Sequence, residues 1–260
     1  MPRLMNTEAT TGLLDTEEVM QQNGPGAFQF SGVRIDSLGA TEYTLVTIVC
    51  DISGSVANFS NQLLDMVKTV VESCKKSPRA ENLLIRFITF NSDIVEIHGF
   101  RLLNDIDPND YDPMNCGGLT ALYDASYDAI GATIDYSSRL VNDYEFDING
   151  IVFIATDGLN NQGNMTPKSI ATKINAAIQH EDIESLITIL IQMKDPNSAY
   201  EVEVNEHLKR FKDEANLDQF VDIGDATVST LAKLAQFVSK SISSQSQSLE
   251  NGTPSQTLTF

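Results

Sequence analysis

The chain has 260 residues, of which 42% are hydrophobic, so it can form one large domain or two small ones around a sizeable core. Its 36 Asp and Glu residues outnumber 17 Lys and Arg residues, and the formal net charge of -19 argues against nucleic acid and anionic membranes as partners. The three cysteines show no C-x-x-C spacing, so we expect reduced thiols. The sequence also shows no apolar signal-peptide core and no apolar run near the ~20 residues of a spanning helix. These features predict a cytoplasmic protein.

Residues 1–40 are predicted to be a leader with an edge strand or hairpin, because apolar alternation is confined to residues 28–35. Strands and helices alternate after this leader. The predicted strands are 43–50, 83–90, 93–100, 151–156, 186–193 and 220–223, and the predicted helices are 59–74, 120–136, 166–179, 198–215 and 227–240. The third strand follows the second too closely for a helical crossover, so we expect it to run antiparallel. Asn149-Gly150 is predicted to form a turn before the fourth strand, and Thr166-Pro167 to begin the third helix.

This alternation predicts an α/β fold, a doubly wound, Rossmann-like open sheet that is mostly parallel and has helices on both faces. One short strand is expected to be antiparallel. Residues 41–241 are predicted to form the single domain. Residues 242–260 are rich in Ser and Gln and are predicted to be a flexible tail, because they offer little apolar surface to bury.

Polar residues follow two of the buried strands. The segment DISGS occupies 51–55 after the first strand, TDG occupies 156–158 after the fourth, and GGLT at 117–120 precedes a helix between them. If the strand order is 3-2-1-4-5-6, the first and fourth strands are neighbours, and Asp51 faces Asp157 across the crevice at the carboxyl ends. The candidate ligands are all oxygen donors, a set that suits a hard cation such as Mg²⁺: Asp51, Ser53, Ser55, Thr120 and Asp157.

These three segments together resemble the metal-ion-dependent adhesion site of a von Willebrand factor A (VWA) domain. The resemblance covers about residues 40–241, including the short antiparallel strand. Within the family, the sequence is more similar to intracellular bacterial and phage members than to extracellular adhesins. Val56 stands where many relatives carry Met, and we expect it to pack rather than ligate.

The resemblance implies a role for each ligand residue. Ser53, Ser55 and Thr120 would contact the metal through their hydroxyls, whereas Asp51 and Asp157 would bind it directly or through water. It also implies Mg²⁺ as the ion, with Mn²⁺ or Ca²⁺ as alternatives. The partner implied is a protein that offers a Glu or Asp to the metal. The predicted function is therefore a metal-dependent protein–protein binding module, without catalysis.

Two other functions remain open. An assembly or structural subunit would use the helical faces of the fold, with an incidental metal. A metal-dependent phosphohydrolase would use Asp51 as nucleophile, but Ser53 stands where its general acid would be, so we do not expect an enzyme. Either Asp could also simply cap the helix that follows it.

Weaker candidates lie elsewhere in the sequence. The segment DIDPNDYD at 105–112 lacks the Gly and terminal Glu of an EF-hand loop, so it is predicted to be a solvated acidic loop at the rim of the metal face. His98, His180 and His207 are isolated and are expected to be surface or partly buried residues rather than ligands. Cys116 is a weak candidate for a reactive thiol near the site.

Overall fold

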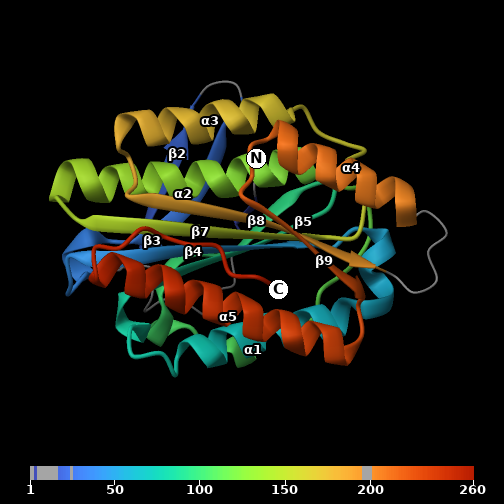
Figure 1. Cartoon of the computed structure of the whole chain (residues 1–260), viewed down its shortest axis with the longest axis horizontal. Coiled ribbons are helices and arrows are strands. Elements are labelled where there is room, and N and C mark those ends of the chain that lie inside the picture. Colours follow the sequence, from blue (N-terminus) through green and yellow to red (C-terminus); the bar gives the residue numbers. More distant parts are fainter. Residues whose placement is uncertain (1–2, 5–16, 24–25, 195–200) are drawn as a thin grey trace.

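The computed structural model describes residues 3–4, 17–23, 26–194 and 201–260. A central sheet lies between two helical layers, with α2, α3 and α4 on one face and α1 and α5 on the other (Figure 1). The helices are α1 (Ser60–Cys74), α2 (Leu122–Tyr144), α3 (Pro167–His180), α4 (Glu201–Glu214) and α5 (Val228–Glu250). Part of the predicted leader and the predicted start of the fourth helix, at 198–200, lie outside the described residues. None of the helices in the described part of the chain is both long and apolar enough to cross a bilayer.

The strand order of the sheet confirms the predicted arrangement. The described strands are β1 (Arg3–Leu4), β2 (Glu17–Gln22), β3 (Phe28–Val33), β4 (Glu42–Asp51), β5 (Leu83–Phe90), β6 (Ile94–Leu102), β7 (Asp147–Thr156), β8 (Ser185–Lys194) and β9 (Gln219–Asp225). They are arranged β2-β3-β6-β5-β4-β7-β8-β9, with β1 beside β6. The strands β6-β5-β4-β7-β8-β9 correspond to the order 3-2-1-4-5-6, and β4 pairs in parallel with both β5 and β7. The strand β6 runs antiparallel to β5, as its short connection predicts.

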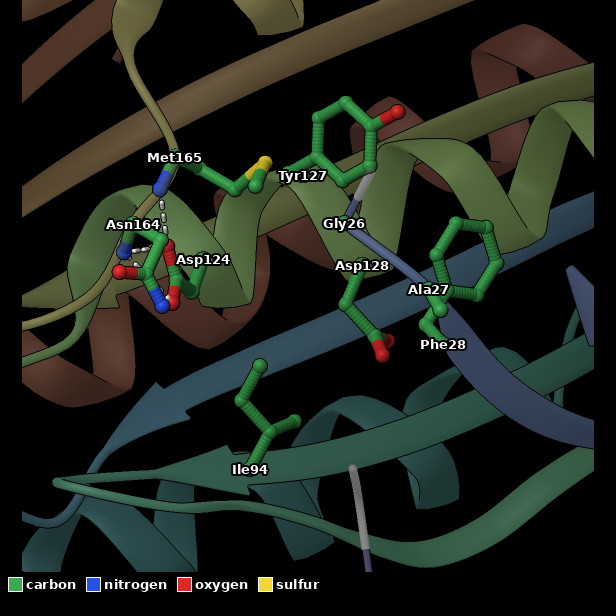
Figure 2. A pocket seen from close by; sticks show the side chains of 9 residues that line it. All are labelled: Gly26, Ala27, Phe28, Ile94, Asp124, Tyr127, Asp128, Asn164 and Met165. Atoms are coloured by element: carbon green, nitrogen blue, oxygen red, sulfur yellow. Dashed lines mark hydrogen bonds between the residues drawn. The ribbon is translucent and has the colours of Figure 1, made fainter. Parts of the chain in front are cut away.

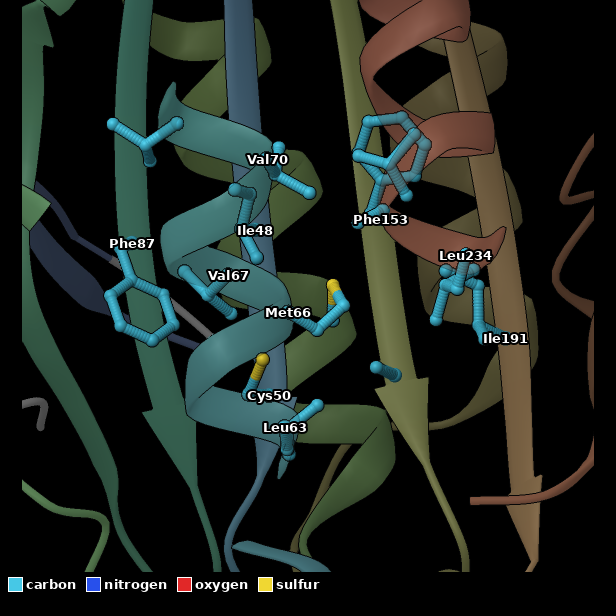
Figure 3. Packing of buried hydrophobic residues seen from close by; sticks show 14 of the residues in the cluster. Ile48, Cys50, Leu63, Met66, Val67, Val70, Phe87, Phe153, Ile191 and Leu234 are labelled. Atoms are coloured by element: carbon cyan, nitrogen blue, oxygen red, sulfur yellow. The ribbon is translucent and has the colours of Figure 1, made fainter. Parts of the chain in front are cut away.

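Each face of the sheet has its own hydrophobic core. Side chains of β4 alternate between the two, since Val46 and Ile48 pack towards α1 and α5, whereas Val49 packs towards α2, α3 and α4. On α1, residues at helical spacing such as Leu63 and Val67 complete the first core (Figure 3). Burial on both faces explains why the parallel strands read as continuous apolar runs.

At the N-terminal edge, β2 and β3 form an antiparallel pair, and β3 lies parallel to β6. Phe28 and Phe30 of β3 are buried in a third cluster, which also contains Tyr136 of α2. This edge therefore extends the sheet beyond the antiparallel strand β6.

The last helix is longer than the sequence predicts. The expected end near Lys240 is wrong, because α5 continues to Glu250, so residues 242–250 are helical rather than part of a tail. Ile242 is fully buried in the core beside α1. The Gln245 carbonyl accepts a hydrogen bond from the Asn149 side chain (3.1 Å), and the Gln245 side chain donates to the Gly150 carbonyl (3.3 Å). These contacts stabilise the segment, although its average composition predicts little burial.

The predicted turn at Asn149-Gly150 is also wrong, because both residues lie within β7. A Cβ at Gly150 would come within 2.8 Å of Ile183 and 3.1 Å of Thr133, so glycine permits close packing rather than a turn. The helix α2 also extends further than expected, to Tyr144. In contrast, the predicted start of α3 is confirmed, since the Thr166 hydroxyl caps the helix by accepting from the Ser169 N–H.

Candidate metal site

The centre of the candidate site is Asp51, the last residue of β4. Its side chain is completely buried, and its Oδ2 atom accepts a hydrogen bond from the Thr156 hydroxyl at the end of β7 (2.6 Å). Its Oδ1 atom accepts the backbone N–H of Ser53 (2.7 Å). Burial raises the pKa of Asp51, although the bonds from Thr156 and Ser53 oppose that rise. The two neighbouring strands are thus joined at their carboxyl ends by a desolvated carboxylate.

A chain of short contacts leads from this carboxylate to the surface. The Ser53 and Ser55 hydroxyl oxygens lie 3.3 Å apart, and the Ser55 hydroxyl donates to Asp157 Oδ1 (2.9 Å). Ser53 is buried and Ser55 is exposed, and the chain forms a short 3₁₀ helix, Gly54–Phe59, soon after β4. The structure therefore brings together four of the five residues predicted as ligands.

Thr120 reaches the same region from the loop before α2. Its backbone N–H donates to the Asn161 side chain (2.7 Å), and its carbonyl accepts from the Asn161 N–H (3.0 Å). Its hydroxyl oxygen lies 3.6 Å from the position that a Cβ on Gly158 would occupy. Thr120 thus lies beside the turn that carries Asp157.

Several positioning residues were not assigned a role from the sequence. Thr156 holds Asp51, Asn161 holds the backbone at Thr120, and Asn91 donates to the Gly117 carbonyl (2.7 Å). Each of these polar residues ends a strand or follows one closely, and that position was the only available signal. Their partners come from other strands and loops, so the pairings depend on the folded arrangement.

The donor set fits a hard divalent cation. It consists of two carboxylates and three hydroxyls, which are oxygen donors of the kind that Mg²⁺ prefers. Asp51 forms no ion pair with a Lys or Arg among the described residues, so its buried charge lacks a basic partner. No group of three or more His, Cys, Asp and Glu residues is placed to hold a metal in that part of the chain. A metal here would consequently depend on the hydroxyls as well as the two carboxylates.

The other sequence candidates have structural roles or exposed positions. The aspartates of 105–112 are exposed, as predicted, and Asp107 accepts the backbone N–H of Asn109 (2.9 Å). His98 is buried rather than superficial, bonds to the Tyr111 hydroxyl (2.8 Å), and has its pKa lowered to about 4 by burial. His207 stacks on Tyr123, and His180 is exposed.

Two residues beside the motif also have clear environments. Val56 is fully buried and belongs to the core, which confirms the expectation that it packs. Burial raises the pKa of Cys116, and the charges of Asp51 and Asp157 raise it further against a hydrogen bond from Ser60. This environment disfavours the thiolate, so it does not support a reactive thiol.

Comparisons with known proteins show similarity in fold. No family model and no curated protein matches the chain. The PilB minor pilin from Streptococcus sanguinis is similar at a TM-score of 0.54 and 12% identity, over 82% of this chain and 64% of the pilin. The SpaC pilus adhesin from Lactobacillus rhamnosus GG is similar at a TM-score of 0.54 and 11% identity, over 88% of this chain and 35% of the adhesin. The chain thus spans less than two thirds of either protein.

The shared property is the fold. The ArnB paralogue VWA2 from Sulfolobus acidocaldarius has a lower TM-score of 0.45, at 14% identity over 87% of this chain and 55% of that protein. The mostly parallel sheet with its antiparallel strand β6 and two helical layers is consistent with a VWA-like fold.

Proposed function

We propose that this chain is a non-enzymatic, metal-dependent module for protein–protein binding. Mg²⁺, or alternatively Mn²⁺ or Ca²⁺, would bind at the carboxyl ends of β4 and β7, and a Glu or Asp of a partner protein would complete its coordination. The main support is the pair of contacts that joins the two strand ends, from Thr156 to Asp51 and from Ser55 to Asp157. They gather oxygen donors at one edge of the sheet, where α/β folds bind ligands.

Each side chain has a distinct part in this proposal. The hydroxyls of Ser53, Ser55 and Thr120 would ligate the ion without adding charge, and Asp51 and Asp157 would balance its two positive charges. When bound, the ion would supply an electrophilic position for an external carboxylate. Rigid contacts within the protein already orient Asp51, which reduces the cost of ordering the site.

The net charge of the chain bears on the partner. A protein with a formal charge of -19 repels acidic surfaces at long range, so an acidic side chain needs the local attraction of a metal. We therefore expect the partner to be basic around a single protruding carboxylate. Two proteins of similar fold are named as a minor pilin and a pilus adhesin, which favours an adhesin-like binding role. The cytoplasmic location remains a prediction.

Calorimetric titration of Mg²⁺ and Mn²⁺ into chelator-treated protein tests the metal site directly. We expect saturable binding of about one ion per chain, abolished in Asp51→Asn and Asp157→Asn because each loses a ligand charge. Asp143→Asn, an exposed change on α2, is the matched control and should bind like the wild type. Absence of saturable binding by the wild type, or unchanged binding by both site variants, would contradict the proposal.

An assembly subunit that binds through its helices is the second candidate. Ile178 on α3 and Val202 on α4 are large apolar residues that are 59% and 73% exposed. Partner capture by the wild type in magnesium and in chelator separates the two functions. Capture that is lost in chelator supports the metal-dependent module, whereas equal capture in both buffers supports the assembly subunit.

A further inference from the structure

A buried ion cluster lies under α2, away from the candidate metal site. Arg86 of β5 is completely buried and donates from Nε to Glu96 Oε2 (2.7 Å) and from an Nη atom to Asp128 Oδ1 (2.8 Å). Glu96 belongs to β6 and Asp128 to α2, and both are 2% exposed. Two carboxylates therefore share one guanidinium, and the ionised cluster carries one excess negative charge in a buried position.

The hydrogen bonds locate this excess at Asp128. Both oxygens of Glu96 are used, since Oε1 also accepts from the backbone N–H (2.9 Å) and the hydroxyl (2.7 Å) of Ser31. Asp128 Oδ2 is buried and has no hydrogen-bond partner among the described residues. A buried carboxylate oxygen without a partner is costly, and a cation compensates both its charge and its missing bond.

Asp128 is part of the wall of a cavity of about 300 Å³ between α2, β3 and β6 (Figure 2). Most of the other side chains of the wall are apolar or aromatic, and they include Phe28, Ile94, Tyr127 and Met165. The cavity is large enough for a small organic molecule. None of the five candidate metal ligands lines it.

A second carboxylate in the wall, Asp124, is already engaged. Its Oδ1 atom accepts from the backbone N–H groups of Asn164 (2.9 Å) and Met165 (2.6 Å), and its Oδ2 atom accepts from Asn164 as well (3.1 Å). It therefore secures the loop after β7 against α2. A metal ion would find too few free oxygen donors beside these apolar walls, whereas an organic cation needs one carboxylate and an apolar surface.

We propose that this cavity binds a small organic cation, a primary ammonium group carried on an apolar body. The ammonium pairs with Asp128, and the body packs against Phe28, Ile94, Tyr127 and Met165. This site is independent of the metal site and of the function proposed for it.

Titration of the protein with 2-phenylethylamine in chelator, with binding monitored by protein NMR, tests the site. Its uncharged counterpart 2-phenylethanol serves as the ligand control. We expect saturable binding of the amine by the wild type, and affinity lower by about tenfold or more for the alcohol or for Asp128→Asn, since either change removes a charge-assisted contact. Asp143→Asn, an exposed change on the same helix, should leave binding unchanged.

A second variant keeps the test decisive if Asp128→Asn fails to fold. Ile94→Trp places a larger side chain in the cavity wall and leaves the three residues of the ion cluster unchanged, and it should also abolish amine binding. Circular dichroism establishes that each variant is folded. The proposal is overturned if the wild type shows no saturable amine binding, if amine and alcohol bind equally, or if the folded variants bind the amine like the wild type.

Discussion

At the scale of single residues, Asp51 is a buried acidic residue that forms no ion pair with a Lys or Arg among the described residues. Hydroxyls and one backbone N–H surround it, and burial raises its pKa. An ionised carboxylate in such a place opposes folding unless something compensates it. This property connects the stability of the metal-free protein to the proposed function, because the same charge that destabilises the fold would attract the ion.

The substitution Asp51→Asn separates these two effects. In chelator, we expect the melting temperature of the variant to be about 2–4 °C above that of the wild type. The amide carries no charge, which should raise the free energy of unfolding by about 1 kcal/mol, and its oxygen still accepts from the Ser53 N–H. In excess Mg²⁺ the order should reverse, since only the wild type gains stability from ion binding. Thermal unfolding in both buffers measures the order. A variant that is less stable than the wild type in chelator would contradict the argument about Asp51.

The sequence could identify the candidate ligands but not the residues that hold them. Asp51, Ser53 and Asp157 could be selected because they stand in recognisable segments at strand ends. The role of Asn161 depends on the approach of two loops that are far apart in sequence, and no local pattern encodes it. His98 was expected to be a surface or partly buried residue, yet the packing of Tyr111 from the following loop buries it almost completely.

At the scale of elements, α5 shows why composition alone misplaced a boundary. Its C-terminal part is rich in Ser and Gln, which lowers the average hydrophobicity, but the burial of individual side chains decides the structure. Ile242 enters the core, and Gln245 makes specific bonds to β7. Ser246 is small enough to be fully buried, and its hydroxyl accepts from Arg79 (3.2 Å). These partners cannot be inferred from a segment read in isolation.

Substitutions within this part of α5 test its contribution to stability. We expect Ile242→Ala to lower the free energy of unfolding by about 2–5 kcal/mol, because it leaves a cavity in the core beside α1. Gln247→Ala, at an exposed position of the same helix, should change it by no more than about 0.5 kcal/mol. Urea unfolding of both variants provides the comparison. Equally small effects would indicate that residues 242–250 do not dock on the sheet.

At the scale of the whole molecule, the directions of the central strands could be predicted because elementary rules restrict them. Helical crossovers require β4, β5, β7, β8 and β9 to be parallel, and a short connection requires β6 to be antiparallel. The position of β3 could not be predicted, since it pairs with β6 after a long separation in sequence. The site inherits its geometry from this order, because β4 and β7 meet where the crossovers reverse.

The overall charge of the molecule leads to a final prediction, about salt. With a formal charge of -19, the folded chain repels itself, so any added salt should raise its melting temperature by screening. A specific metal site adds a second contribution that screening cannot supply. At matched ionic strength, we therefore expect MgCl₂ to raise the melting temperature of the wild type more than NaCl does.

The variant Asp157→Asn makes this comparison specific to the site. It removes one of the 36 acidic residues, so its response to NaCl should match that of the wild type, while its additional response to Mg²⁺ should disappear. Thermal unfolding across both salt series measures the two contributions separately. If the wild type and the variant gain the same additional stability from MgCl₂, the ion acts through the acidic surface as a whole, and the paired strand ends are not where it binds.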